Sequence, residues 1–215
     1  MNLPGIEYKG DISKFIESEN DPYSNICFYK DLDYFKDEVL YSKFVKKCEQ
    51  QVRTSKDYST FISYIKSVLG MNYCQVLSQI YDSDNVKGGP IVEMHHGPLF
   101  TLYDITSIVL NWFLKTGTKI NTFRVIDRIL EEHFDLRVQV VMLSTVAHEA
   151  SHNRDLYINI NQGIGNINEF IKFYSDCLDD IHKYKIWNYI EYSKNNPSFD
   201  KGILDTEHIQ KIIKM

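Results

Sequence analysis

The sequence is poor in cysteine: four are scattered over 215 residues, and no two of them form a C-x-x-C pair. This spacing argues against a disulfide framework and against a cysteine-ligated zinc site, and it fits a reducing compartment. Long apolar runs are missing too, because the longest, around residues 105–114, is too short to span a bilayer. The first residues lack the basic and apolar regions of a signal peptide. We therefore expect a soluble, cytoplasmic protein with no membrane partner.

The sequence also lacks an excess of basic residues. Its 24 lysines and arginines are outnumbered by 29 acidic residues, so the net charge is −5. A negative charge counts against a protein that grips long tracts of nucleic acid through their phosphates. The hydrophobic fraction of 43% and the charged fraction of 25% are ordinary for a globular protein, so the chain can bury a core. We expect a single domain over residues 1–215.

Both ends of the chain carry helical periodicity. The N-terminal part, residues 1–73, contains an amphipathic stripe over residues 58–69 and is predicted to be helical. The C-terminal part, residues 161–215, is predicted to hold a long helix over residues 167–181 and a short helix that begins at Thr206.

The middle of the chain mixes strand and helix signals. Residues 74–81 are rich in strand formers, and turn residues separate them from a second strand that ends at His95, so they predict a β-hairpin. A capping box opens a helical hairpin over residues 101–135. Residues 137–143 return to strand composition, and a helix over residues 144–154 follows. The prediction is an α+β fold in which helices surround this middle part.

Four of the seven histidines fall in two tight pairs. His148 and His152 are one helical turn apart, share a helix face and have a recurrent spacing for holding one metal ion. His95 and His96 are adjacent at the end of a predicted strand, where neighbouring side chains point to opposite faces. One of these two is expected to bind the ion and the other to face a substrate. The other three histidines are expected to be packed and hydrogen-bonded: His133, His182 and His208.

Two segments of the chain resemble the HNH, or ββα-metal, endonuclease family. Nine positions separate Gln139 from His148, as in the family's Asn-to-His spacing, although Gln replaces that Asn and the family's zinc cysteines are replaced by other residues. His152 matches the final histidine of members that end H-x-x-x-H. Upstream, residues 93–98 resemble the family's strand-terminal His-His step. The layout is also similar to uncharacterised HNH-like bacteriophage proteins, and the richness in Lys, Asn, Ile and Tyr fits a phage origin, which would place the protein in the host cytoplasm.

The resemblance implies a ββα-metal core over residues 74–160 and the hydrolysis of phosphodiester bonds in DNA, with RNA as an alternative. It makes His96 the general base and places Gln139 where the family's Asn orients that base. One divalent ion would stabilise the leaving oxygen, with Mg²⁺ or Mn²⁺ as the working ion, although Zn²⁺ or Ni²⁺ also bind imidazoles. The implied metal ligands are His95, His148 and His152. The arginines expected to contact nucleic acid are Arg137 and Arg154.

Two other interpretations remain open. Residues 148–152 also form a literal H-E-x-x-H, the zinc metalloprotease motif, with Glu149 as general base and Glu169 as a candidate third ligand. The alternative from another class is a catalytically inactive HNH-like fold that serves as a binding or assembly module, with a metal as a structural staple. The acidic net charge and the loss of the family's Asn favour this second alternative.

Overall fold

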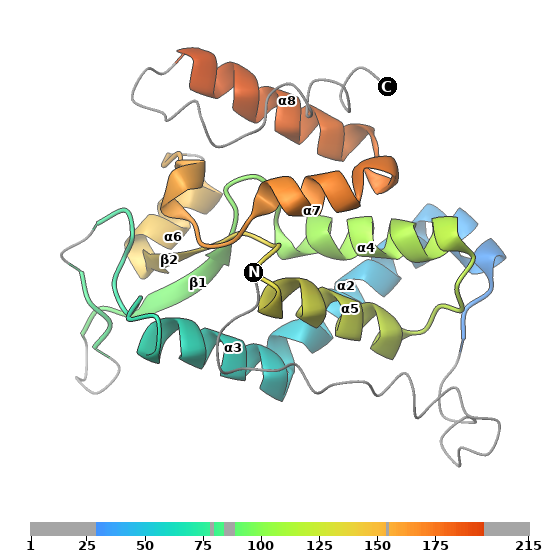
Figure 1. Cartoon of the computed structure of the whole chain (residues 1–215), viewed down its shortest axis with the longest axis horizontal. Coiled ribbons are helices and arrows are strands. Elements are labelled where there is room, and N and C mark those ends of the chain that lie inside the picture. Colours follow the sequence, from blue (N-terminus) through green and yellow to red (C-terminus); the bar gives the residue numbers. More distant parts are fainter. Residues whose placement is uncertain (1–28, 78–79, 84–88, 154, 196–215) are drawn as a thin grey trace.

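The computed structural model describes residues 29–77, 80–83, 89–153 and 155–195, and this part of the chain is mostly helical (Figure 1). Its described residues form seven α-helices and one two-stranded antiparallel sheet, which together make an α+β fold. No helix within those ranges is both long and apolar enough to cross a membrane. The expected α+β class is therefore confirmed.

The N-terminal helices begin and end where the sequence supplies caps. A short 3-10 helix, η1 (Leu32–Lys36), precedes α2 (Glu38–Thr54), whose first turn is capped by the Asp37 carboxylate. Ser55 ends α2 and also caps α3 (Lys56–Ser67), because its hydroxyl accepts a hydrogen bond from the Tyr58 amide. The helical character predicted for this part is confirmed over these residues.

The sheet pairs two strands that are far apart in the sequence. Strand β1 (Val92–His96) runs antiparallel to β2 (Val140–Ser144), with Val92 opposite Ser144 and His96 opposite Val140. The predicted hairpin between residues 74–81 and β1 is wrong, because the partner of β1 is β2.

Residues 74–77 and 80–81 lie beside the sheet, and these described residues add no strand to it. An isolated bridge joins Tyr73 to Tyr81. Gln75 covers the free edge of β2. Its backbone N–H donates to the Met142 carbonyl at 2.8 Å, and its side-chain oxygen accepts from the Met142 backbone N–H at 2.6 Å. One glutamine thus satisfies the two backbone groups that a further strand would have paired, so the local strand propensity is overridden.

A helical hairpin joins the two strands, as the sequence predicted. Helix α4 (Leu102–Thr116) starts at a capping box formed by Thr101 and Asp104, and it ends at Gly117, whose φ of 67° is the left-handed value that glycine adopts without strain. Helix α5 (Thr122–Phe134) returns toward the sheet.

The C-terminal helices differ from the prediction of one long helix. Helix α6 (Thr145–His152) follows β2 directly, and a short 3-10 turn, η2 (Ile160–Gln162), comes next. Helix α7 (Ile167–Phe173) then gives way to the 3-10 turn η3 (Ser175–Cys177) and to α8 (Asp180–Asn195).

The break after α7 has a local cause. The Tyr174 side chain is fully buried and donates a hydrogen bond from its hydroxyl to Glu132 on α5 at 2.7 Å. Asp179 then starts a new helix, because its carboxylate accepts from the His182 amide at 2.9 Å. The short helix predicted from Thr206 lies outside the described residues.

The two strands divide the buried side chains into two clusters. The main hydrophobic core includes Val92 and Met94 of β1 together with helices from both ends of the chain. A smaller cluster contains Val141 and Leu143 of β2 with Ala147 of α6. Strand β2 is therefore buried on both faces, whereas β1 has a buried face and an outer face that stays partly exposed next to α6.

Candidate metal centre

Strand alternation places His95 on the outer face of β1. Val92, Met94 and His96 point into the main core, whereas Glu93 and His95 point to the opposite side, where both keep solvent exposure. Outer-face position and partial exposure make His95 available to bind something outside the core.

Helix α6 brings two further histidines to this face. Strand β2 ends at Ser144, and this residue is also the N-cap of α6, with its hydroxyl accepting from the Ala147 amide at 3.4 Å. No loop separates strand and helix, so the connection fixes where α6 crosses the sheet. Ala147 packs into the smaller cluster, and the next positions of the helix place His148 and His152 beside β1.

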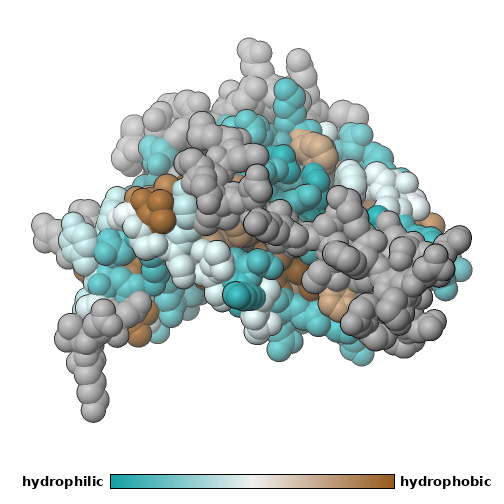
Figure 2. All heavy atoms as spheres, turned by 60° about the horizontal axis from the view of Figure 1, so that its bottom comes forward, coloured by the Kyte–Doolittle hydropathy of each residue, from teal (hydrophilic) through white to brown (hydrophobic). Residues whose placement is uncertain are grey.

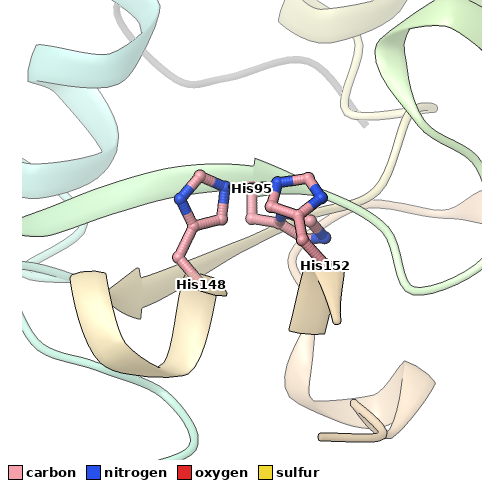
Figure 3. Close-up of side chains that lie close together, drawn as sticks. All are labelled: His95, His148 and His152. Carbon is pink, nitrogen blue, oxygen red and sulfur yellow. Dashed lines mark hydrogen bonds between the residues drawn. The ribbon is translucent and has the colours of Figure 1, made fainter. Parts of the chain in front are cut away.

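The three imidazoles His95, His148 and His152 form a compact group, called here the histidine cluster (Figure 3). One nitrogen from each ring lies within 4.8 Å of the others. His148 Nε2 and His152 Nε2 are 3.1 Å apart, and the ring of His95 meets both rings edge-on at centroid distances of 5.0 and 5.1 Å. The structure thus brings together the three residues that the sequence had proposed as ligands.

Glu93 supports the histidine cluster from its neighbouring position on β1. Its carboxylate oxygen Oε2 is 2.9 Å from His148 Nδ1. Because a carboxylate only accepts, the hydrogen bond requires a proton on Nδ1 and leaves the lone pair of the neutral ring on Nε2, which faces His152. Sequence reasoning missed Glu93. Its i, i+2 spacing to His95 on a strand was the signal that could have found it.

The surroundings of His95 favour its neutral form. Burial, together with the smaller electrostatic influence of His148, His152 and Arg53, lowers the pKa of His95 to about 4. At neutral pH the His95 ring is uncharged and offers a nitrogen lone pair, which is the form that binds a metal ion.

His96 lies on the opposite side of β1 and does not join the cluster. Its ring is 4% exposed, stacks against Tyr58 and places Nε2 at 2.8 Å from His133 Nε2. His133 Nδ1 donates to the Ile129 carbonyl at 2.7 Å, so His96 Nε2 must be the donor between the two rings. Burial lowers the pKa of His96 well below its usual value. The residue expected to face a substrate is thus part of the core.

Gln139 is also buried and has a structural partner. Its side-chain amide donates to the Ile160 carbonyl at 2.5 Å, and the side chain is only 4% exposed in total. Gly163 lies so close that an added Cβ would come within 2.6 Å of the Gln139 Cγ. The described contacts of Gln139 tie β2 to the chain after α6, and they do not orient a histidine.

Of the two arginines expected to contact nucleic acid, only Arg137 lies among the described residues. Arg137 binds Glu132 through Nε at 2.5 Å and Asp135 through its terminal nitrogen at 2.8 Å. Glu132 is fully buried and is also paired with Arg128, so Arg137 belongs to an internal ion-pair network. Arg154 lies outside the described residues.

The third residue beside the two histidines of the H-E-x-x-H motif is not the one that the sequence suggested. The third imidazole beside His148 and His152 is His95 of β1. Glu169 lies in the first turn of α7, is exposed and is not part of the cluster. The ligand proposed from the sequence for a metalloprotease site is therefore replaced by a histidine from the sheet.

A Ser-His-Asp arrangement occurs elsewhere, between α4 and α8. Ser107 Oγ is 3.0 Å from His182 Nε2, and His182 Nδ1 is 2.8 Å from Asp179 Oδ1. These distances resemble those of a nucleophile, a base and an orienting carboxylate. However, Ser107 and His182 are 3% and 2% exposed, and Ser107 also donates to the Asp104 carbonyl at 2.9 Å. The arrangement therefore joins two helices in the core, where a substrate has no access.

The fold and the cluster together define a mostly helical α+β protein with three histidines gathered between a small sheet and a short helix. A family model described as Bacteriophage G278-like virion protein matches residues 5–215. The chain belongs to this family. No curated protein and no solved structure matches the chain.

The family match corrects the resemblance on which the sequence-based function rested. The chain was expected to belong to the HNH endonuclease family and to hydrolyse DNA, and both expectations are wrong, because its family is one of virion proteins. The phage origin that composition suggested agrees with the match. The family description also implies a component of the phage particle.

Proposed function

We propose that the protein is a non-enzymatic binding or assembly component of a phage particle. The single observation that carries this proposal is the family match, which spans nearly the whole chain and thus includes the histidine cluster and the helices around it. This is the assembly alternative that the acidic net charge and the missing Asn had favoured.

The surroundings of the residues that were expected to act in catalysis or nucleic-acid binding support a structural role for them. His96 and Gln139 are buried and hydrogen-bonded to core partners, and Arg137 is paired with two carboxylates. Side chains held by such internal bonds stabilise a fold and do not turn toward a substrate, although the buried Oε1 of Gln139 has no hydrogen-bond partner. In our proposal β1, β2 and α6 form a ββα unit, and the helical hairpin is an insertion within it, which agrees with the principle that one fold can carry unrelated functions.

The surface supports protein partners over nucleic acid. The net charge is −5, which disfavours long phosphate contacts. The face in Figure 2 mixes hydrophilic residues with small hydrophobic patches. On α8, three apolar or aromatic side chains are exposed on the side away from the core: Ile181, Tyr184 and Trp187. Tyrosine and tryptophan are enriched in protein interfaces, so we expect the partners to be other proteins of the particle.

The proposal is tested on the phage that encodes the chain. Gradient-purified particles should contain the protein at a fixed copy number, measured by quantitative mass spectrometry against the major capsid protein. The protein should remain after a high-salt wash that removes adsorbed lysate proteins. A protein found in the lysate and absent from washed particles would overturn the proposal. A nonsense mutation in the gene, complemented in trans as the control, should yield particles that are incomplete or non-infectious.

A further inference from the structure

We propose that His95, His148 and His152 bind one transition-metal ion of the zinc type, and that Glu93 positions His148 for this task. The proposal rests on the geometry of the described residues alone, so it stands or falls independently of the role in the phage particle.

The spacing of the nitrogens fits a single ion. Two nitrogens that each bind Zn²⁺ at about 2.0–2.1 Å with tetrahedral geometry are about 3.3 Å apart. The separation of His148 Nε2 and His152 Nε2 is 3.1 Å, and the candidate nitrogen of His95 lies within 4.8 Å of the other two. A rotation of the His95 ring that brings its nitrogen to the same separation would complete a three-nitrogen face around an ion.

Glu93 supplies an interaction that accompanies metal-binding histidines. A ligating imidazole usually donates its other N–H to a carboxylate, which fixes the tautomer and the ring orientation. Glu93 Oε2 is 2.9 Å from His148 Nδ1, and His148 Nε2 is the atom that faces the cluster. The contact holds the ring with its lone pair directed toward the proposed ion.

A chain of hydrogen bonds without metal would explain only part of the arrangement. In such a chain, His152 Nε2–H would donate to His148 Nε2, and His148 Nδ1–H would donate to Glu93. This chain leaves out His95, whose ring is similarly close to both of the α6 histidines and whose Nε2 has only a long contact of 3.5 Å with the Ser151 hydroxyl. An ion accounts for the third imidazole as well as the first two.

The ligand chemistry selects the class of ion. Imidazole nitrogens suit Zn²⁺, Ni²⁺, Co²⁺ and Cu²⁺, whereas Mg²⁺ prefers oxygen ligands in octahedral geometry. Since the cluster offers three nitrogens and the Glu93 carboxylate is engaged by His148, we expect Zn²⁺ to bind far more tightly than Mg²⁺ or Mn²⁺. This differs from the Mg²⁺ or Mn²⁺ that a nuclease would use.

The ion would add a further link between α6 and the sheet, which otherwise meet through the smaller hydrophobic cluster and the hydrogen bond between His148 and Glu93. Helix α6 has eight residues, and of these only Ala147 is buried. Short helices owe their stability mainly to tertiary contacts. An ion held by His95 on β1 and by two residues of α6 would fasten the helix to the sheet. Three protein ligands also leave a fourth coordination position, which water would fill.

Metal binding by the full-length, metal-stripped protein tests the proposal. Isothermal titration with Zn²⁺ should give one tight site per chain, and Mg²⁺ under the same conditions should give none. Co²⁺ should produce the intense visible absorption bands of a tetrahedral site. His152→Ala removes an exposed ligand, so it should abolish both signals while the far-UV circular dichroism stays that of the wild type. Mg²⁺ binding as tight as Zn²⁺, or a zinc site that persists in His152→Ala, would overturn the proposal.

A matched pair of variants isolates the part played by Glu93. Glu93→Gln and Glu149→Gln make the same chemical change, but Glu149 is an exposed residue of α6 outside the cluster. Loss of a supporting carboxylate typically lowers metal affinity about 10–100-fold. We expect that loss for Glu93→Gln and unchanged affinity for Glu149→Gln. Equal affinities in both variants would refute the role of Glu93 while leaving the ion site intact, and neither result depends on whether the protein is found in phage particles.

Discussion

The two faces of β1 put neighbouring histidines in opposite environments. His95 lies on the outer face with two other imidazoles and the Glu93 carboxylate, whereas His96 lies in the core against His133 and Tyr58. The pleat of the strand therefore decides whether an imidazole faces the core or the outside. On the outer face a lone pair can reach an ion, and on the inner face the same group becomes part of the packing. Substitutions on the two faces should therefore have different effects.

The largest effect is expected on the inner face. His96→Ala removes a buried ring and leaves His133 Nε2 without its hydrogen-bond donor. The cavity and the unsatisfied nitrogen should together lower the free energy of unfolding by about 3–5 kcal/mol, measured by urea denaturation. His152→Ala, an outer-face substitution, should change this free energy by less than about 1 kcal/mol in metal-free protein. An equal loss of unfolding free energy in both variants would contradict the proposed difference between the two faces.

The pH dependence of stability should also reflect the inner face. Burial lowers the pKa of His133 to about 4 in the folded protein, against a usual value of 6.5. Between these values the unfolded chain binds more protons, so stability is full above pH 6.5 and is lost as the pH falls toward 4. The expected loss from His133 alone is about 3 kcal/mol. Urea denaturation of metal-free protein from pH 7 to pH 4 measures it, and His133→Gln should flatten the slope. A slope unchanged in that variant would contradict the assignment.

The outer face should affect stability through the ion. An ion at 100 times its dissociation constant stabilises the folded state by about 2.7 kcal/mol, which corresponds to a rise in Tm of roughly 5–10 °C for a chain of this size. Differential scanning calorimetry with and without Zn²⁺ should detect this rise in the wild type and lose it in His152→Ala. His96→Ala should start from a lower Tm and still respond to the ion if it folds. A Tm that Zn²⁺ does not move would contradict the proposed site.

The smallest effect is expected at the junction that places α6. Ser144→Ala removes the N-cap of this helix, which should destabilise the protein by about 1 kcal/mol. Because the cap fixes the helix that carries His148 and His152, zinc affinity should also fall a few-fold. Thr145→Ala, an exposed substitution at the next position, is the control and should leave the affinity unchanged. An identical zinc titration for both variants would show that the cap does not position the cluster.

Local sequence patterns were enough to predict several elements around the cluster. The capping box at Thr101 and the helical stripe behind it predicted α4, and the i, i+4 spacing of His148 and His152 predicted a shared helix face. Alternation also predicted that His95 and His96 point to opposite sides. Which side is the core depends on how α3 and α5 pack beneath the strand, and no local pattern around β1 contains that information.

Most of the errors arise from tertiary contacts. Residues 74–81 have strand composition, but Gln75 pairs with the edge of β2 in their place. The stripe over residues 167–181 is continuous in sequence, yet the buried hydrogen bond of Tyr174 and the cap at Asp179 divide it. The spacing between Gln139 and His148 matched an enzyme family, but spacing alone does not report that Gln139 is buried against Ile160. The contacts of Gln75, Tyr174 and Gln139 are tertiary and cannot be seen in a local pattern, whereas the cap at Asp179 is a local signal that the prediction missed.

Zinc K-edge X-ray absorption on the full-length protein, loaded with one equivalent of Zn²⁺, tests whether the outer face of β1 binds an ion through three imidazoles. We expect a first shell of nitrogen or oxygen at about 2.0 Å, with the outer-shell scattering of three imidazole rings and no sulfur. His152→Ala should remove this signature. A shell of sulfur at about 2.3 Å, which would assign the ion to cysteines, or an all-oxygen shell without imidazole scattering would contradict it.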